Sequence, residues 1–512
     1  MNMSTANRVL GLFLLAASIF LIILGITSPG VVDEFNVYWM ATVSALIPGV
    51  LLMAGKPGAA TYFARIVVGS VFIVSGLIKA NDTVGFGIKL EEYFDENALG
   101  AFWAAFHDYS LPLAIFISGI EVLLGLAVLF GAAARLVAIV LLGMTIFFGW
   151  LTYFTAECND AQMAAISAGE AFNRVCVTDC GCFGDALRGS VGRSLTPWES
   201  FYKDLGLFFL TLIIVVRSKK ISVNTLKQDL IIAPFALLIT LLFGGWLFGW
   251  MFPTIFFVVS FIIYFVLKSI ISERPKLDVI LAVVLAVITY GFAFYTYLNL
   301  PIKDYRPYAE GINIKDQMKS AEELGVEPTQ YANVYKLKNS ETGEEMTMNS
   351  NEYLEQEIWK DKSWEITYTS PEPVVIERGY EPPIATFNVM DEDNYDVGEE
   401  LLNDENYSFM VVMYDVEKAD EGNLEALKEL SAKAEEAGYH FYALTSSSYD
   451  TYESFRHEHG LAFPFYTGDE IFLKTIIRAN PGMLLLKNGE ILEKWHGNNL
   501  PEYEEVEADF LN

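Results

Sequence analysis

Basic residues are scarce in this chain, with 34 Lys and Arg against 64 Asp and Glu and a formal net charge of −30. Nucleic-acid binding needs clustered positive charge to displace counterions, so this composition argues against a nucleic-acid partner. The imbalance is concentrated in residues 301–512, which hold 45 of the acidic and 17 of the basic residues. The first 300 residues are nearly neutral, so the chain joins an apolar part to an acidic, solvated part.

Cysteine is also scarce, because the chain has only four and residues 183–512 contain none. The four are Cys158, Cys176, Cys180 and Cys182. No histidine lies in residues 156–203, and cysteines that bind zinc usually stand two or more residues apart. We therefore expect no metal site in this region.

Two further absences narrow the class of protein. No clear small-residue cleavage site follows the first apolar run, so we expect this run to remain as a membrane span rather than to be removed as a signal peptide. A pair of broken helices in repeated halves is also missing, which argues against a small-solute transporter.

Long apolar runs dominate the first 300 residues. About 20 helical residues cross the roughly 30 Å hydrocarbon core of a bilayer. By this measure the sequence predicts nine transmembrane helices, at 9–28, 37–54, 61–80, 111–130, 134–155, 197–217, 230–250, 254–271 and 277–298. The sixth is the least apolar, but Thr196 and Glu199 predict a capping box at its start, with Pro197 at the first helical position.

The distribution of Lys and Arg predicts the orientation of these helices. If nine helices alternate in direction, the basic clusters of the membrane part, above all the one at 217–227, fall on one side, which is the cytoplasm. We therefore expect a multi-pass protein of the bacterial cytoplasmic (inner) membrane, with a cytoplasmic N-terminus and an extracytoplasmic, periplasmic C-terminal half. All four cysteines then lie outside the cytoplasm, where disulfides persist.

The four cysteines allow two interpretations and three pairings, which the sequence does not choose between. In the first interpretation, Cys180 and Cys182 are a redox-active pair, because a bridge across Gly181 alone is strained and easily reduced. Cys158 and Cys176 would then relay electrons or steady the loop. In the second interpretation, a Cys158–Cys176 bridge and a further bridge have only a structural role and stabilise the outer loop 156–203.

Several motifs resemble one family. Residues 65–82, 89–94 and 118–125, with Cys-Gly-Cys-Phe-Gly at 180–184, are similar to the DoxX/MauE group of bacterial membrane proteins. The resemblance implies a four-helix unit over residues 61–217, with the cysteine loop between its third and fourth helices. It also implies a link to quinone-coupled oxidation and to disulfide formation in exported proteins, with quinone as the candidate cofactor. The resemblance implies that the functional residues are Arg65, Lys79, Asp82, Glu121, Cys180 and Cys182.

Glu121 is the acidic residue nearest to mid-membrane in this unit. A carboxylate is costly there, so we expect it to be protonated, paired or facing an interior cavity, with Lys79 as its partner. In a functional role Glu121 would transfer a proton to a quinone or form a hydrogen bond with it. In a structural role it would connect two helices. Gly69 and Gly76 share one helix face and predict close packing there.

Strands are predicted after residue 300. Short strands occur in the connector at 331–338, 345–348 and 364–369. From residue 385 onwards, strands at 408–414 and 440–445 alternate with helices at 423–437 and 449–459, and a last hairpin, 482–487 with 491–495, turns at Asn488-Gly489. This order predicts a parallel strand pair followed by an antiparallel hairpin.

The layout of residues 385–512 resembles the thioredoxin fold, and residues 479–482 are similar to the proline loop of that family. The resemblance implies a cis Asn480–Pro481 bond and a substrate-binding or partner-binding position at Pro481. The redox pair of a thioredoxin would fall at 416–421, where this chain has no cysteine. Thiol exchange requires a thiolate, so we expect this domain to bind a protein rather than to exchange thiols itself.

Together these patterns predict a multi-domain protein, with a polytopic α-helical membrane domain and an α/β thioredoxin-like extracytoplasmic domain. The expected parts are an N-terminal hairpin (1–60), the DoxX/MauE-like unit (61–217), three further spans (218–300), a β-containing connector (301–384) and the thioredoxin-like domain (385–512). One hypothesis is thiol–disulfide or quinone-linked redox chemistry on an extracytoplasmic protein client. The alternative is a non-catalytic membrane scaffold or envelope assembly factor with structural disulfides.

Overall fold

The computed structural model describes residues 5–27, 37–168, 172–177, 181, 183–187, 194–370, 373–377 and 379–511. The chain divides into two compact units. The helical unit comprises residues 1–161 and 173–295, and the C-terminal unit comprises residues 162–172 and 296–512.

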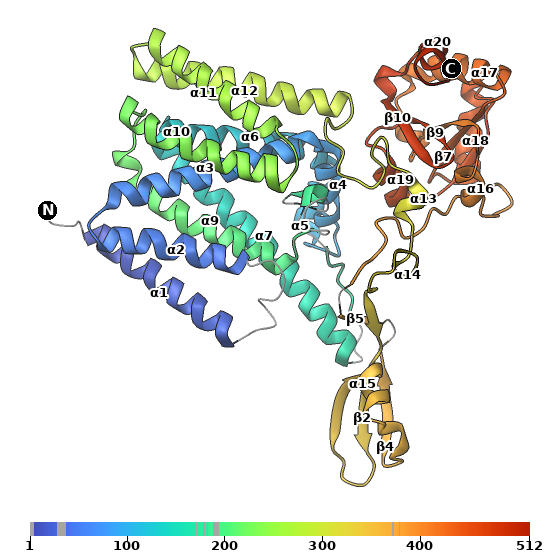
Figure 1. The fold of residues 1–512 in the computed structure, drawn as a ribbon, viewed down its shortest axis with the longest axis horizontal. Helices are drawn as coiled ribbons and strands as arrows, with labels where there is room; N and C mark the ends of the chain where they lie inside the picture. Colours follow the sequence, from blue (N-terminus) through green and yellow to red (C-terminus); the bar gives the residue numbers. More distant parts are fainter. Residues whose placement is uncertain are drawn as a thin grey trace. The chain divides into compact units, whose positions relative to one another are not determined.

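Long helices build the helical unit (Figure 1). They are α1 Thr5–Thr27, α2 Val37–Met53, α3 Pro57–Asn81, α6 Ser110–Phe130, α7 Ala134–Ala168, α9 Pro197–Arg217, α10 Leu226–Thr240, α11 Phe252–Ile270 and α12 Arg274–Leu298. Shorter helices lie between them: α4 Thr83–Tyr93, α5 Ala101–Ala104, η2 His107–Tyr109, η3 Gly184–Leu187, η4 Ser218–Lys220 and the π-helical η5 Leu241–Leu247.

Seven of these helical segments are long and apolar enough to cross a membrane within the residues that the structure describes. Helices also form at the other two predicted positions, but they differ from the seven. α2 has 17 residues and is shorter, and α9 carries Glu199, Lys203 and Asp204 near its start. The structure therefore supports a polytopic helical membrane part with seven spans by length and composition, where nine were predicted. The predicted capping box of Thr196 and Glu199 is confirmed at the start of α9.

α3 and α6 lie at the centre of the helical unit. They pack against each other, and α3 also packs against α2, α9 and α10. Most of the apolar stretch of α3 is buried, whereas only 28%, 22% and 28% of the stretches at α1, at α10 with η5, and at α12 are buried, and many of their exposed side chains are apolar. Helices with apolar side chains on their outer surface are typical of a bundle in lipid.

A five-stranded sheet organises the C-terminal part of the chain. Its strands are β6 Tyr407–Val412, β7 His440–Thr445, β8 Phe465–Thr467, β9 Gly482–Lys487 and β10 Glu490–His496, in the order β10-β9-β6-β7-β8. β6 and β7 are parallel, β9 is antiparallel to β6, and β9 and β10 form a hairpin. The predicted parallel pair and hairpin are thus confirmed, and both turn residues, Asn488 and Gly489, have a positive φ.

Helices cover both faces of this sheet. Phe409 and Val411 of β6 pack with α17 Leu424–Glu436, α18 Tyr449–His459 and α20 Tyr503–Val506. Met410 and Val412 point to the other face and pack with α19 Glu470–Ile476. Residues of the predicted connector, among them Tyr308 and Ile314, are part of this second core. β8 and α19 were not predicted from the sequence.

Two small sheets complete the C-terminal unit (Figure 1). β2 Val334–Asn339 lies between β3 Glu345–Asn349 and β4 Trp364–Thr369, and β1 Gln330–Ala332 pairs with β5 Val374–Glu377. The three strands predicted in the connector are confirmed, but the first of them is divided at Asn333 into β1 and β2. The remaining short helices are α13 Ile314–Gln317, α14 Ala321–Leu324, α15 Ser350–Glu355, η6 Ile358–Lys360, α16 Gly398–Leu402, η7 Val416–Lys418, η8 Glu421–Asn423, η9 Gly497–Asn499 and η10 Glu507–Leu511.

Candidate functional site

Cys158 and Cys176 form a disulfide, with their Cα atoms 5.6 Å apart. Cys158 lies in α7 and is completely buried, and Cys176 lies in the loop that follows this helix. The Nδ2 atom of Asn159 donates a hydrogen bond to the carbonyl oxygen of Val177 at 3.0 Å, which ties the same loop to α7. Of the three possible pairings, this bridge is compatible only with the one that joins Cys158 to Cys176. Both interpretations of the cysteines include it, so it does not choose between them.

Cys180 and Cys182 lie outside the described residues, but Gly181 between them is described. Gly181 has a φ of 61°, in the region that favours glycine. A Cβ atom at this position would lie 2.7 Å from Cγ of Lys89. The backbone conformation therefore favours glycine between the two cysteines, and a larger residue would displace the side chain of Lys89.

The residues on either side of this Cys-Gly-Cys segment are packed into the helical unit. Val177 is buried in an apolar cluster with Phe86, Leu90 and Tyr93, among others. Phe183 is buried as well, and its ring centre lies 5.2 Å from that of Phe248. The protein thus holds the chain firmly just before and just after the two cysteines.

Lys79 and Glu121 form the buried ion pair that was predicted from the sequence. Nζ of Lys79 lies 2.5 Å from Oε1 of Glu121, and the two side chains are 6% and 3% exposed. The pair joins the last turn of α3 to the middle of α6. Close contact of these helices requires Gly76, where a Cβ atom would lie 2.7 Å from Cγ2 of Val122 and 2.8 Å from the carbonyl oxygen of Ser118.

The environment of this ion pair is aromatic and leaves one acceptor unused. Nζ of Lys79 lies 5.3 Å from the ring centre of Phe86 and 4.9 Å from that of Phe148. Oε2 of Glu121 is buried and has no hydrogen-bond partner among the described residues. Such an atom in a native structure calls for an explanation, and one explanation is a functional role.

Asp82 has a structural position beside this pair. It lies between α3 and α4, and its Oδ1 accepts a hydrogen bond from the backbone N–H of Gly85 at 2.8 Å. This is the helix N-cap arrangement, in which aspartate typically contributes about 1 kcal/mol to stability. The geometry therefore accounts for Asp82 as the residue that starts α4.

Arg65 is completely buried and closes the end of α6. Its Nε donates to the carbonyl oxygen of Val128 at 2.8 Å, and its Nη2 donates to that of Leu129 at 2.9 Å. Carbonyls in the last turn of a helix have no partner within the helix, and arginine is one of the side chains that satisfy them. Nη2 also donates to Oδ1 of Asn224 at 2.7 Å, which connects α3 to the segment before α10.

A buried polar network that the sequence reasoning missed continues from Asn224. Its Nδ2 donates to Oδ1 of Asp229 at 2.9 Å, and Nζ of Lys268 lies 2.6 Å from Oδ2 of the same carboxylate. The signal was present in the sequence, because Asp229 and Lys268 are charged residues at the ends of apolar helices, where they are rare and usually paired.

A second missed pair lies in α9. Nζ of Lys203 lies 2.8 Å from Oδ1 of Asp204, with the side chains 11% and 4% exposed. Thr152 of α7 donates to Oδ2 of Asp204 at 3.3 Å. Nζ of Lys203 also lies 5.2 Å from the ring centre of Phe183, which directly follows Cys182 in the chain. These charges explain why the sixth helix predicted from the sequence, at 197–217, is the least apolar of the nine.

In the C-terminal unit, the predicted cis Asn480–Pro481 bond is confirmed. The carbonyl oxygen of Asn480 accepts from the backbone N–H of Asp420 at 2.9 Å, and Nδ2 of Asn480 donates to the carbonyl oxygen of Asp415 at 2.7 Å. Pro481 therefore lies beside the segment that follows β6. Residues 416–421 of that segment contain no cysteine; they are one valine, one lysine, one alanine and three acidic residues.

Comparisons with known proteins agree with part of this arrangement. Residues 60–153 match the model of the DoxX family. The matched segment runs from α3 into α7 and contains Arg65, Lys79, Asp82 and Glu121, but it ends before the first cysteine. Searches of curated proteins and of solved structures found no significant match to this chain.

Proposed function

We propose that this chain is a DoxX-like integral membrane protein that performs thiol–disulfide exchange outside the cytoplasm, with Cys180 and Cys182 as its redox pair. The Cys158–Cys176 bridge leaves Cys180 and Cys182 as the two remaining cysteines of the chain, and the observation that carries the proposal is the glycine that separates them. Gly181 has a positive φ, and such a backbone conformation suits a tight turn between the two cysteines. The bridged pair Cys158–Cys176 steadies this loop.

The proposed exchange is a two-electron reaction. A thiolate of a client protein attacks the Cys180–Cys182 disulfide and forms a mixed disulfide, which releases one of the two cysteines as a thiolate. The second client thiolate then resolves this bond, so the client leaves oxidised and Cys180 and Cys182 become a dithiol. They return to the disulfide by giving two electrons and two protons to a membrane quinone, which leaves as the hydroquinone.

The proposed location is the bacterial cytoplasmic membrane, with the cysteine loop and the C-terminal half in the periplasm. The basic residues at the end of α9 and in η4 support this orientation through the positive-inside rule. Single reporter cysteines test it in a chain that carries Cys180→Ser and Cys182→Ser. A membrane-impermeant maleimide is expected to label Met163→Cys and to spare Lys219→Cys in intact cells, and the reverse pattern would place the loop in the reducing cytosol.

We further propose that residues 385–511 form a thioredoxin-like domain that binds the client. The strand order β7-β6-β9-β10, with helices on both faces and a cis proline beside the end of β6, supports this interpretation. This domain contains no cysteine, so it binds an extended segment beside Pro481 while Cys180 and Cys182 perform the exchange.

Trapping of the mixed disulfide tests the proposed function. Removal of one cysteine of the pair leaves the other without its resolving partner. We expect Cys180→Ser or Cys182→Ser to accumulate a client adduct that disappears on reduction, and the double variant to accumulate none. If both single variants fold normally and neither carries an adduct, the proposed exchange is wrong.

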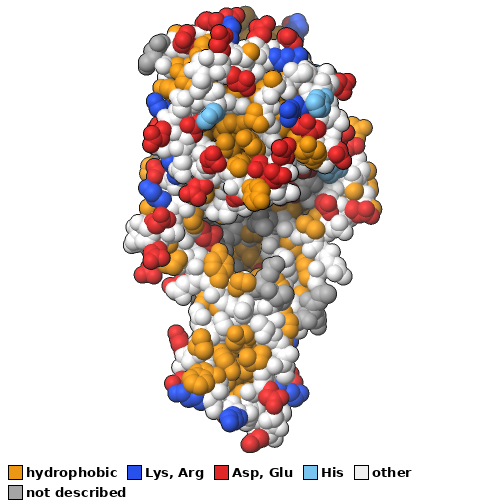
Figure 2. Space-filling view, turned by 90° about the vertical axis from the view of Figure 1, so that its right-hand side faces the viewer, with side chains coloured by type: hydrophobic (Ala, Val, Ile, Leu, Met, Phe, Trp, Pro, Cys, Tyr) orange, Lys and Arg blue, Asp and Glu red, His pale blue; other side chains and the backbone are white. Residues whose placement is uncertain are grey.

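One observation favours the alternative function, a non-catalytic scaffold. Apolar side chains gather around the three-stranded sheet of the C-terminal unit and the helices α15 and η6 beside it, where Leu354, Trp359 and Ile366 are 60%, 54% and 43% exposed (Figure 2). Exposed apolar patches often mark protein-binding surfaces. For a scaffold, Trp359→Ser would remove binding of the partner, whereas serine at Cys180 and Cys182 would leave it unchanged.

A further inference from the structure

A groove on the C-terminal unit lies between the edge strand β10 and the helical segments α20 and η10. Its wall is formed by Glu493 and Trp495 of β10 and by residues between 501 and 510. The groove has a volume of about 640 Å³, which is within the range of ligand-binding sites. Pro481 does not line it, so this acidic groove is a different surface from the one proposed for the client.

Every charged residue that lines the acidic groove is negative. These residues are Glu493, Glu504, Glu505 and Asp509. Glu504 forms an ion pair with Lys433 on the surface. The other three carboxylates form no ion pair with a lysine or arginine of the described chain. The groove therefore has an excess of negative charge that the protein itself leaves unbalanced.

A neighbouring carboxylate adds to this excess at one end of the groove. Glu310 lies beside Glu493, and burial together with the charge of Glu493 raises the pKa of Glu310 to about 7. A raised pKa of this kind means that two like charges repel each other at close range. A positive group that binds next to Glu493 would relieve this repulsion.

The arrangement of the carboxylates does not fit a metal ion. Among the described residues, no group of three or more His, Cys, Asp and Glu side chains is placed to hold one. A calcium or magnesium ion needs several oxygen ligands around a single point. The carboxylates of the groove instead lie along its wall, which suits an occupant with positive charges at several separate positions.

The aromatic side chains of the groove indicate which positive group fits. The rings of Trp495 and Phe510 lie with their centres 6.1 Å apart and their planes at 87°. The guanidinium group of arginine stacks on aromatic rings and also forms forked hydrogen bonds to carboxylates. We propose that the acidic groove binds an extended, arginine-containing basic segment of a partner protein.

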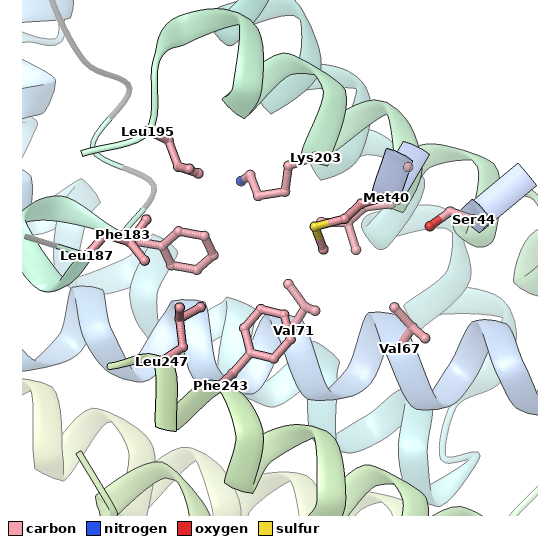
Figure 3. A pocket seen from close by; sticks show the side chains of 12 residues that line it. Met40, Ser44, Val67, Val71, Phe183, Leu187, Leu195, Lys203, Phe243 and Leu247 are labelled. Atoms are coloured by element: carbon pink, nitrogen blue, oxygen red, sulfur yellow. The ribbon is translucent and has the colours of Figure 1, made fainter. Parts of the chain in front are cut away.

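The cavity in the helical unit offers no such site. It lies between α2, α3, η3, α9 and η5, and its walls are almost entirely apolar (Figure 3). Its volume is only about 60 Å³, and Lys203 is the only charged residue that lines it. A basic segment would lose its hydration there without gaining a negative partner. Of these two cavities, only the acidic groove therefore suits a basic segment.

Fluorescence anisotropy of a labelled peptide, titrated with the purified full-length protein in a non-ionic detergent, tests the proposal. The peptide has 12 residues in which arginine alternates with serine. We expect saturable binding that weakens as the salt concentration rises, because exposed charges are screened. The same peptide with citrulline in place of arginine keeps the shape but not the charge, and we expect it not to bind.

Variants of the groove show where the peptide binds. We expect Glu505→Gln with Asp509→Asn to weaken binding about tenfold, because two ion pairs with the peptide are lost. Phe510→Leu removes one ring and is expected to weaken binding about fivefold. Glu399→Gln with Glu400→Gln removes two exposed charges of α16 outside the groove. This matched control is expected to bind within about twofold of the wild type.

Four results would overturn the proposal. They are no saturable binding of the arginine peptide, equal binding of the citrulline peptide, equal affinity of the groove and control double variants, and tighter binding of spermidine than of the peptide. The last result would make the groove a polyamine site. The inference does not depend on the proposed redox function, so the variant with serine at Cys180 and Cys182 is expected to bind the arginine peptide as the wild type does.

Discussion

Nζ of Lys79 lies 2.5 Å from Oε1 of Glu121, and both side chains are buried between α3 and α6. This pair lies inside the segment that matches the DoxX family, where Gly76 allows close contact of α3 with α6. Burial of two opposite charges as a pair costs much less free energy than burial of either charge without its partner. The pair therefore stabilises the contact of α3 with α6 and keeps a carboxylate, with one unused oxygen, in the middle of the bundle.

The first prediction concerns this pair. Glu121→Leu leaves the charge of Lys79 buried without a partner, and we expect a loss of about 3 kcal/mol in the free energy of unfolding. Lys79→Met combined with Glu121→Leu removes both charges and is expected to recover most of this loss. Reversible unfolding of the detergent-purified protein, analysed as a double-mutant cycle, measures the coupling.

Lys276→Ala is the control for the ion-pair experiment. It breaks the exposed pair with Glu273, in which both side chains are 66% exposed. Exposed pairs contribute about 0–1 kcal/mol, so little change is expected. Equal effects of Glu121→Leu and Lys276→Ala would show that the buried pair contributes no special stability.

The second prediction concerns the glycine that brings α3 and α6 together. Gly76→Ala places a Cβ atom against Val122 and the backbone of Ser118, so the helices must separate, at a cost of about 1–3 kcal/mol. Gly143→Ala in α7 meets no atom within 4 Å and is expected to be neutral or slightly stabilising. Thermal unfolding of the two variants side by side decides the question, and similar melting temperatures would contradict the packing described for α3 and α6.

Local patterns in the sequence predicted much of this architecture. The capping box at Thr196, the hairpin turn at Asn488-Gly489 and the parallel pair β6–β7 all follow from neighbouring residues and their spacing. The Lys79–Glu121 pair was also predictable, because a carboxylate within an apolar helix needs a partner and Lys79 was the nearest basic residue of the preceding span.

Contacts between distant segments were not predictable in this way. Arg65 and Asn224 are 159 residues apart, and nothing in the local pattern of either residue indicates the other. The same reason explains why Tyr308 and Ile314, in a segment expected to be a connector, were not recognised as core residues of the C-terminal sheet. Their side chains are buried by strands that follow more than 90 residues later.

The third prediction concerns the buried polar cluster at the edge of that sheet. Nζ of Lys494 donates to Oδ2 of Asp304 and to the carbonyl oxygens of Tyr308 and Ile476. Burial lowers the pKa of Lys494 to about 8, so it remains mainly charged at neutral pH. Lys494→Met removes the donor from the carbonyl oxygens of Tyr308 and Ile476, while Asp304 keeps its ion pair with Arg306, and we expect a loss of about 3 kcal/mol in stability. Urea unfolding of the full-length protein, followed by hydrogen exchange in β9 and β10, measures it.

Lys433→Met is the matched control for Lys494→Met. Lys433 pairs with Glu504 on the surface, with side chains 46% and 59% exposed. Its removal is expected to change stability by less than about 1 kcal/mol. If Lys494→Met were as mild as this control, the cluster would not hold residues 304–310 to the sheet.

The fourth prediction is a pH dependence of the same region. Burial and the nearby carboxylate of Glu493 raise the pKa of Glu310 to about 7. The folded protein therefore binds this proton more tightly than the unfolded chain, so its contribution to stability is present at low pH and is lost as the pH rises through about 7. We expect hydrogen-exchange protection factors of residues 304–318 to fall between about pH 5 and pH 8. Glu310→Gln should make the protection factors nearly independent of pH in this range. If they fall as steeply in this variant as in the wild type, another group causes the pH dependence.

The redox state of the cysteines in living cells shows whether Cys180 and Cys182 exchange electrons with quinone. Rapid alkylation with a mass-tagged maleimide, in cells whose quinone synthesis is switched on or off, reports the thiols of the wild type and of the Cys180→Ser/Cys182→Ser variant. We predict that Cys180 and Cys182 are oxidised when quinone is present and become reduced when it is withdrawn, while Cys158–Cys176 stays bridged in both conditions. A pair that keeps one redox state whatever the quinone supply would contradict it.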